Sequence, residues 1–166
     1  GGKQGIVSFP QGTRVVTMKV ATSFLSSAQA KHNLELEIGS AGFDAIYKSA
    51  RTAWDDVCGI FEIEGASYTE LVSFYSSLYR MYAYPSLYSE NEGTNEDPIW
   101  VYGSPYKSGI KTSGMMYTNN GFWDTYRAAW AGYALFTPER DTDYLNGMCS
   151  TISKPDGCPD GLVRGQ

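Results

Sequence analysis

Two opposite charges stand three residues apart in an aromatic segment of the sequence, "NNGFWDTYRAAWAG" (119–132). A carboxylate beside an indole ring can accept hydrogen bonds from vicinal sugar hydroxyls, and an arginine can hold that carboxylate in place. Trp123, Asp124 and Arg127 are therefore candidate substrate-binding residues. The alternative is a helix with a carboxylate in its first turn, an ion pair at spacing i, i+3 and core tryptophans. Spacing alone favours this second interpretation.

A second set of candidate ligands lies in the acidic stretch "SENEGTNED" (89–97). Its carboxylates could gather around a hard cation, although their spacing is not that of an EF-hand loop. Charge-rich loops are more commonly solvated, so metal ligands stay unknown at this stage. The residues concerned are Glu90, Glu92, Glu96 and Asp97.

Other chemistry-bearing residues form no recognisable motif. His32, the only histidine, has polar neighbours, which favours a surface or interdomain role over catalysis. No nucleophile elbow, dinucleotide-binding motif or phosphate-binding loop is present. Among the cysteines, a bridge between Cys149 and Cys158 and a buried thiol at Cys58 are slightly preferred over three unrelated thiols.

Composition sets the broad class of the protein. A chain of 166 residues with 13 Tyr, 7 Phe and 4 Trp can build one sizeable aromatic core. The net charge of -5, without a local basic cluster, argues against nucleic acid as a partner. The sequence contains no run of eighteen apolar residues, which a membrane-spanning helix would need, and the N-terminal residues have no signal-peptide core. Both ends look abrupt, which predicts a processed chain or a piece of a longer one.

Hydrophobic periodicity predicts helices after an opening strand. Residues 15–24 alternate and are β-branched, as in a strand. Ser26 and Gln29 have capping-box spacing for the next helix, and a second helix follows with an apolar stripe from Ile46 to Val57. Residues 59–65, "GIFEIEG", alternate as a short half-exposed strand would.

The second half of the chain alternates between helices and a long loop. Ser67 and Glu70 predict a capped helix that runs up to Pro85. Residues 86–120 predict a loop in which "PIWVYG" and "SGMMYT" could pair as a hairpin. Two helices close the pattern: one with helical spacing from Trp123 to Tyr133, and one that starts at Thr137-Pro138 and ends near Gly147.

Four segments in order resemble glycoside hydrolase family 92: "TSFLSSAQAKHNLELEIG", "AIYKSARTAWDDVCGIFEIEG", "LVSFYSSLYRMYAYPSLYSENEG" and "YTNNGFWDTYRAAWAGYALFTPER". The resemblance covers residues 15–148, and "FWDTYR" and "ARTAWDDV" carry it most specifically. Members of this family are calcium-dependent, inverting, exo-acting α-mannosidases. Their N-terminal β-sandwich is joined by helices to an (α/α)6-barrel catalytic domain.

The resemblance implies an α-rich α+β fragment of such an enzyme. Residues 1–25 would end the β-sandwich domain, residues 26–58 would form the linker helices, and residues 59–148 would begin the (α/α)6 barrel. Residues 149–166 form a tail of unclear origin, because "CSTISKPDGCPDG" does not resemble further barrel helices.

The resemblance also implies a function. Trp123 and Asp124 match residues that line the family's mannose pocket, and Arg127 would support the aspartate. The general acid, the general base and most calcium ligands would lie outside this chain, so no catalytic residue is assigned and the chain alone is expected to be inactive. The partners would be mannose-containing glycans and the remainder of the same polypeptide or a companion chain. The location would be secreted or extracytoplasmic, and a non-catalytic carbohydrate-binding or interaction module is the alternative.

Overall fold

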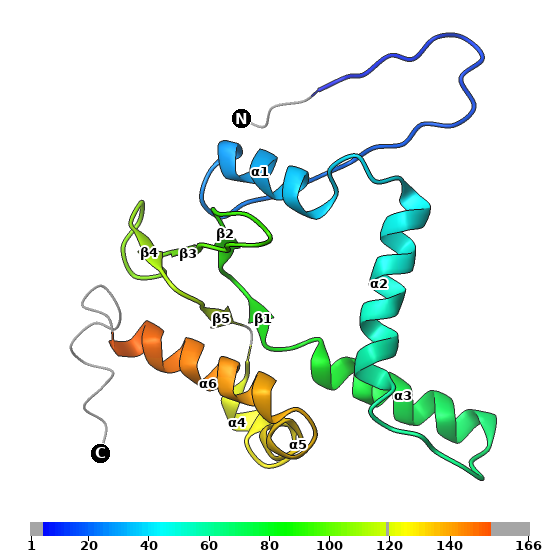
Figure 1. The fold of residues 1–166 in the computed structure, drawn as a ribbon, viewed down its shortest axis with the longest axis vertical. Helices are drawn as coiled ribbons and strands as arrows, with labels where there is room; N and C mark the ends of the chain where they lie inside the picture. The colour runs from blue at the N-terminus through cyan, green and yellow to red at the C-terminus, as the bar shows by residue number, and fades with distance from the viewer. Residues whose placement is uncertain (1–4, 119, 154–166) are drawn as a thin grey trace.

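The computed structural model describes residues 5–118 and 120–153, and this part of the chain contains six helices and five short strands (Figure 1). Three helices precede the strands and three follow them. The helices are α1 (Ser27–Glu37), α2 (Phe43–Cys58), α3 (Tyr68–Tyr82), α4 (Phe122–Thr125), α5 (Ala129–Phe136) and α6 (Pro138–Ser153). The strands are β1 (Ser86–Leu87), β2 (Glu90–Asn91), β3 (Trp100–Gly103), β4 (Lys111–Ser113) and β5 (Tyr117–Thr118).

Local capping chemistry starts α1 and α3 where the sequence predicts. The hydroxyl of Ser26 accepts a hydrogen bond from the backbone N–H of Gln29 at 3.0 Å. Ser67 and Glu70 form a complete capping box, in which the Glu70 carboxylate accepts from the Ser67 N–H at 2.8 Å. The bonds from the Ser67 side chain and backbone lower the pKa of Glu70. Both caps satisfy N–H groups that a first helical turn leaves without partners.

Helix α2 confirms the predicted helix, but its apolar stripe is buried only near its C-terminal end. Val57 is 9% exposed and Trp54 packs beside it, whereas Ala50 and Ala53 are exposed. Cys58, predicted to be a buried thiol, is half-buried. The proposed partner of Cys149 lies outside the described residues.

Two predicted strands do not form. Residues 15–24 and 59–65 contain no strand, because neither segment has a neighbouring strand to bond with. Val15 and Val20 are 83% and 62% exposed, so the first part of this segment is largely uncovered, whereas Phe24 at its end packs on Tyr88. In residues 59–65 the predicted alternation appears only in the burial of the side chains, with Phe61 half-buried and Glu62 exposed.

The long loop contains two small antiparallel sheets. Strands β2, β3 and β4 form one in that order, with Val101 opposite both Glu90 and Ser113, and β1 pairs with β5 in the other. The predicted hairpin is correct for its first strand, since β3 lies within "PIWVYG". It is wrong for its second strand, because the partner of β3 is β4 (Lys111–Ser113), whereas Tyr117 and Thr118 of "SGMMYT" form β5 and pair with β1. Helix α6 also runs past Gly147, where a Cβ would come within 2.7 Å of the Tyr117 ring. Gly147 therefore leaves space for the Tyr117 ring to pack against α6, and it does not end the helix.

The core lies where α3, α5 and α6 meet, and tyrosines dominate it. Tyr133 is 2% exposed and contacts Tyr82 and Tyr144 with ring centroids 5.9 Å and 5.5 Å away. Its one hydroxyl hydrogen is shared between two acceptors, the carbonyls of Met81 at 2.7 Å and Tyr84 at 2.8 Å. Both carbonyls lie at or just beyond the C-terminal end of α3, where carbonyl groups have no hydrogen-bond donor within the helix. Burial, with the neighbouring tyrosines, raises the pKa of Tyr133 to about 12, so the phenol remains a donor at neutral pH.

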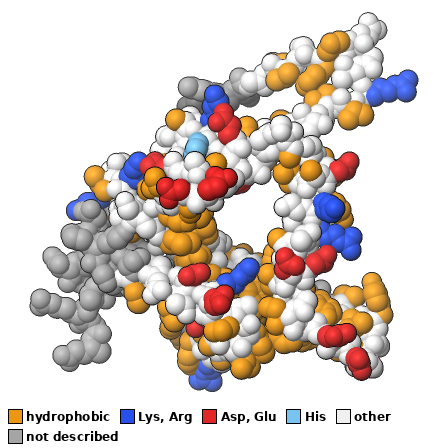
Figure 2. All heavy atoms as spheres, viewed as in Figure 1, with side chains coloured by type: hydrophobic (Ala, Val, Ile, Leu, Met, Phe, Trp, Pro, Cys, Tyr) orange, Lys and Arg blue, Asp and Glu red, His pale blue; other side chains and the backbone are white. Residues whose placement is uncertain are grey.

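Several apolar helix faces lie uncovered. Figure 2 shows hydrophobic atoms gathered over the region of α3 and α5. Tyr68 on α3 is 81% exposed and Leu135 on α5 is 73% exposed. Contiguous exposed apolar surface of this kind marks an interaction surface in soluble proteins.

We predict that Tyr133→Phe destabilises the protein. The change leaves two carbonyl acceptors without their donor, which costs about 1 to 3 kcal/mol for a buried group. Chemical denaturation of the longest natural polypeptide that carries this sequence would measure the fall in midpoint. Tyr79→Phe is the matched control, since Tyr79 is 51% exposed and its ring contact with Trp54 needs no hydroxyl. Equal midpoints for both variants would contradict the role of the Tyr133 hydroxyl.

Candidate functional site

The candidate residues lie around one short helical turn, and the continuous helix predicted from Trp123 to Tyr133 is wrong. Helix α4 stops at Thr125, and the backbone at Ala128 leaves helical values with φ -123° and ψ -56°. The Ala128 N–H donates to the Thr125 carbonyl at 3.3 Å, which closes a tighter turn before α5 begins. The break changes the direction of the chain, so that α5 can pack its Gly132 against Met81 of α3.

Asp124 lies on the wall of a shallow pocket of about 200 Å3 between α3 and α4. In the part of the chain that the structure describes, no hydrogen bond or ion pair engages its carboxylate, and no other carboxylate lines the pocket. An oxyanion without a protein partner can accept hydrogen bonds from a ligand. The residues that matter for this pocket are Arg80, Tyr84, Gly121, Asp124, Thr125 and Tyr133.

Gly121 makes room for the Asp124 carboxylate. A Cβ at position 121 would lie 3.0 Å from Asp124 Oδ2, closer than nearly all real contacts of that kind. The Asp124 N–H in turn donates to the Gly121 carbonyl at 2.9 Å. A larger residue at position 121 would therefore displace the carboxylate from its place on the pocket wall.

The other two predicted site residues are not brought into this pocket. Trp123 is 85% exposed and does not line it. Among the described residues no ion pair joins Arg127 to Asp124, and the Arg127 Nε instead donates to the Tyr126 hydroxyl at 2.6 Å. The predicted ion pair is wrong because helical i, i+3 geometry ends with α4 at Thr125. A role for all three residues in substrate binding stays a prediction.

Arg80 is the pocket residue that sequence analysis missed. It lies in the last turn of α3, where a basic residue would ordinarily be interpreted as a favourable partner of the helix dipole. Its guanidinium, whose five N–H groups are all donors, lies beside the pocket that Asp124 lines. Only the packing of α5 on α3 brings this donor near the carboxylate, so no local pattern could have revealed it.

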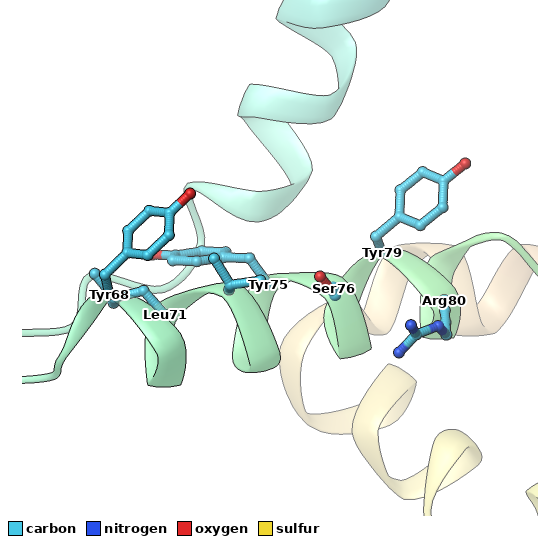
Figure 3. A pocket seen from close by; sticks show the side chains of 7 residues that line it. Tyr68, Leu71, Tyr75, Ser76, Tyr79 and Arg80 are labelled. Carbon is cyan, nitrogen blue, oxygen red and sulfur yellow. The ribbon is translucent and has the colours of Figure 1, made fainter.

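A larger groove follows the exposed face of α3 (Figure 3). It encloses about 680 Å3, and its lining is mainly aromatic and aliphatic. Arg80 is its one charged residue in the described part of the chain, so it offers little chemistry of its own. The labelled residues in the figure are Tyr68, Leu71, Tyr75, Ser76, Tyr79 and Arg80.

A hydrogen-bonded relay from Trp130 through Thr125 to Asn120 stabilises the turn that contains Asp124. The Trp130 Nε1–H donates to Thr125 Oγ1 at 3.2 Å, and the Thr125 hydroxyl donates to Asn120 Oδ1 at 2.6 Å. The Trp130 ring also meets Tyr133 edge-on, with centroids 5.7 Å apart. The relay therefore connects α4 to the tyrosine core, and Asp124 takes its position from that connection.

The acidic stretch does not build a metal site in the described residues. Glu90 accepts from the Phe24 N–H and from the Asn33 amide, both at 2.7 Å, and Glu92 pairs with Lys111 at 2.7 Å. No group of three His, Cys, Asp or Glu side chains in the described ranges could hold a metal ion. The described residues therefore do not form a calcium site by themselves.

His32 connects α1 to the same loop. Its Nε2 lies 2.9 Å from the Gly93 carbonyl, to which the ring can donate. The surface or interdomain role predicted for His32 stays a prediction.

Comparison with known proteins identifies the family of this chain. The family model described as "Glycosyl hydrolase family 92 catalytic domain" matches residues 29–165. The chain therefore belongs to glycoside hydrolase family 92. The match includes the two helices α1 and α2 as well as the part beyond α6.

Individual relatives agree with the family. A family 92 inverting mannosidase from Bacteroides thetaiotaomicron VPI-5482 superposes with a TM-score of 0.73 at 33% identity, over 87% of this chain and 19% of its own. A second solved structure, the family 92 glycosyl hydrolase ccman5, is similar in fold with a TM-score of 0.59 at 24% identity, over 77% of this chain and 16% of its own. An uncharacterized secreted glycosidase of Arthroderma benhamiae is 28% identical over 99 residues, which is 57% of this chain. The chain spans only 12% of that relative.

We predict that Thr125→Val loosens the Asp124 turn. Valine has nearly the same shape but can neither accept from Trp130 nor donate to Asn120, and leaving such partners unsatisfied costs about 1 to 3 kcal/mol. Thermal or denaturant unfolding measures the loss. Thr142→Val is the control, because the Thr142 hydroxyl only bonds back to Pro138 on the exposed face of α6 and should change stability by about 0.5 kcal/mol or less. A Thr125 variant as stable as this control would show that the relay is dispensable.

Proposed function

We propose that this chain supplies one wall of the mannose pocket in a glycosidase that releases mannose from α-mannosides by inverting, calcium-dependent hydrolysis. Family 92 membership and the 33% identity to an inverting mannosidase support this reaction. The observation that carries the proposal is Asp124, which lines a pocket that Arg80 also lines and whose carboxylate has no hydrogen-bond or ion-pair partner among the described residues. A carboxylate and a guanidinium together can recognise the vicinal hydroxyls of a sugar.

The two groups would bind and orient the sugar. Asp124 would accept hydrogen bonds from two hydroxyls of mannose, while Arg80 would donate to a hydroxyl or ring oxygen. An inverting glycosidase needs an acid and a base about 6.5 to 9.5 Å apart, with a water between base and sugar. Asp124 is the pocket's one described carboxylate, so we propose that the acid, the base and the calcium ligands come from other parts of the enzyme.

Family 92 membership and the similarity to a solved family 92 mannosidase also support a proposed architecture. In our proposal, α3, α5 and α6 begin an (α/α)6 barrel, α1 and α2 link it to the preceding domain, and residues 5–25 close a β-sandwich. The exposed side chains of Val15, Met18 and Val20 and the bare face of α3 fit this assignment, because these side chains and that face are left uncovered here. The remainder of the same polypeptide, or a companion chain, would cover them.

We further propose that the enzyme is secreted. One relative carries the name of a secreted glycosidase. Within the described residues, none of the helices is long and apolar enough to cross a membrane.

A non-catalytic carbohydrate-binding module is the second candidate. Its support is the pocket that carries one described carboxylate where hydrolysis needs two. Assays of the 166-residue chain for mannose release and for mannoside binding separate the two functions. The proposed function predicts no release by this chain alone and release by the longest natural polypeptide that contains it. Binding without release in both would favour the module.

We predict that Asp124→Asn lowers kcat/KM on a mannoside about ten- to a hundredfold. The amide keeps the shape of the side chain but replaces a charged acceptor, and a charge-assisted hydrogen bond contributes about 1.5 to 3 kcal/mol. Steady-state kinetics on the longest natural polypeptide, with calcium present, give the ratio. Asp55→Asn is the control, since Asp55 forms an exposed ion pair with Arg51 at 3.5 Å on α2. A folded Asp124 variant with the kinetics of this control would exclude Asp124 from the site.

A further inference from the structure

A second pocket lies at the other end of the molecule from α4, between the start of α1 and the β2–β3–β4 sheet (Figure 1). It encloses about 410 Å3, within the range of about 300 to 1,000 Å3 typical of small-molecule sites. It shares no lining residue with the Asp124 pocket. The side chains that matter here are Phe24, Ser26, Tyr88, Glu92, Ser104 and Lys111.

An ion pair gives this pocket both kinds of hydrogen-bonding group. The Lys111 ammonium lies 2.7 Å from both carboxylate oxygens of Glu92. An ammonium has three donors and a carboxylate about four acceptor sites, so the pair retains capacity for a ligand. Because its two charges cancel, it favours a neutral ligand over an anion or a cation.

Hydroxyls extend the polar side of the pocket. Ser104 Oγ accepts from the N–H groups of Tyr106 and Lys107 at 3.3 Å and 3.2 Å, and its own hydrogen can still be donated. Ser26 Oγ accepts from the Gln29 N–H and can do the same. The pocket lining thus includes both donors and acceptors, which suits a ligand rich in hydroxyls.

Aromatic rings form the apolar side. Phe24 and Tyr88 lie with their centroids 4.4 Å apart, and Phe24 is 71% exposed. The backbone around them is fixed, since the Phe24 N–H donates to Glu90 and the Tyr88 N–H donates to the Met116 carbonyl. Such rings can receive the C–H face of a sugar while its hydroxyls reach the polar side.

We propose that this pocket is a second saccharide-binding site, which takes a neutral pyranose unit of a glycan outside the hydrolytic pocket. The ring of the sugar lies against Phe24 and Tyr88, and its hydroxyls bond to Glu92, Lys111 and Ser104. The proposal rests on the proposed function only for the choice of mannose as the sugar. Its chemistry, a neutral donor and acceptor pair and two aromatic rings in the lining of one pocket, stands on the pocket itself.

Binding of soluble α-mannan tests the proposal. Affinity electrophoresis of the longest natural polypeptide would compare the wild type with Lys111→Met and Glu92→Gln, which keep side-chain length but remove one partner each. We expect each change to raise the apparent Kd for α-mannan about tenfold. Lys48→Met is the matched control, since Lys48 is exposed on α2 and does not line the pocket, so its loss should leave the Kd unchanged.

Three outcomes would overturn the proposal: no α-mannan binding by the wild type, an unchanged Kd in both pocket variants, or loss of binding in Asp124→Asn alone. Melting temperatures identify a variant that merely fails to fold, and the other pocket variant then decides. Hydrolysis of 4-nitrophenyl α-D-mannopyranoside by the wild type is measured separately. Its absence would count against the proposed function, whereas the Kd values alone decide the second site.

Discussion

The structure depends on the buried hydroxyl of Tyr133. This phenol, on α5, bonds to two carbonyls at the end of α3 and contacts Tyr144 of α6. A buried carbonyl without a donor is costly, so the bond fixes how α5 lies on α3. That placement brings Asp124, on the turn before α5, to the pocket beside Arg80 of α3. The candidate site is therefore a consequence of how two helices are joined.

Sequence analysis correctly predicted features that a few neighbouring residues determine. The Ser67 and Glu70 capping box and the period of α3 are contained within a few neighbouring residues, and the structure confirms both. The strand at residues 15–24 was wrong because a strand needs a partner that periodicity cannot supply. Arg80 was missed for a similar reason, since its neighbour Asp124 is distant in sequence and no spacing rule connects them. Trp123 and Arg127 were chosen because they match the family motif "FWDTYR", and neither lines the Asp124 pocket.

The two polar pockets differ in the chemistry that they offer. The Asp124 pocket presents an unpaired carboxylate and an exposed guanidinium, and it lies against the tyrosine core. The pocket at Lys111 presents a neutralised ion pair together with aromatic rings, and its walls come from the start of α1 and from the small sheet. Distinct scaffolds support the two pockets, so a change at one should not propagate to the other through the core.

The central claim is that Asp124 holds a mannose unit. A crystal structure of the longest natural polypeptide with mannose bound tests it most directly. The account predicts two sugar hydroxyls within hydrogen-bonding distance of the Asp124 carboxylate, about 2.5 to 3.2 Å, with Arg80 donating from the opposite side. Mannose bound elsewhere in the catalytic domain, with no sugar atom in contact with Asp124, would contradict it.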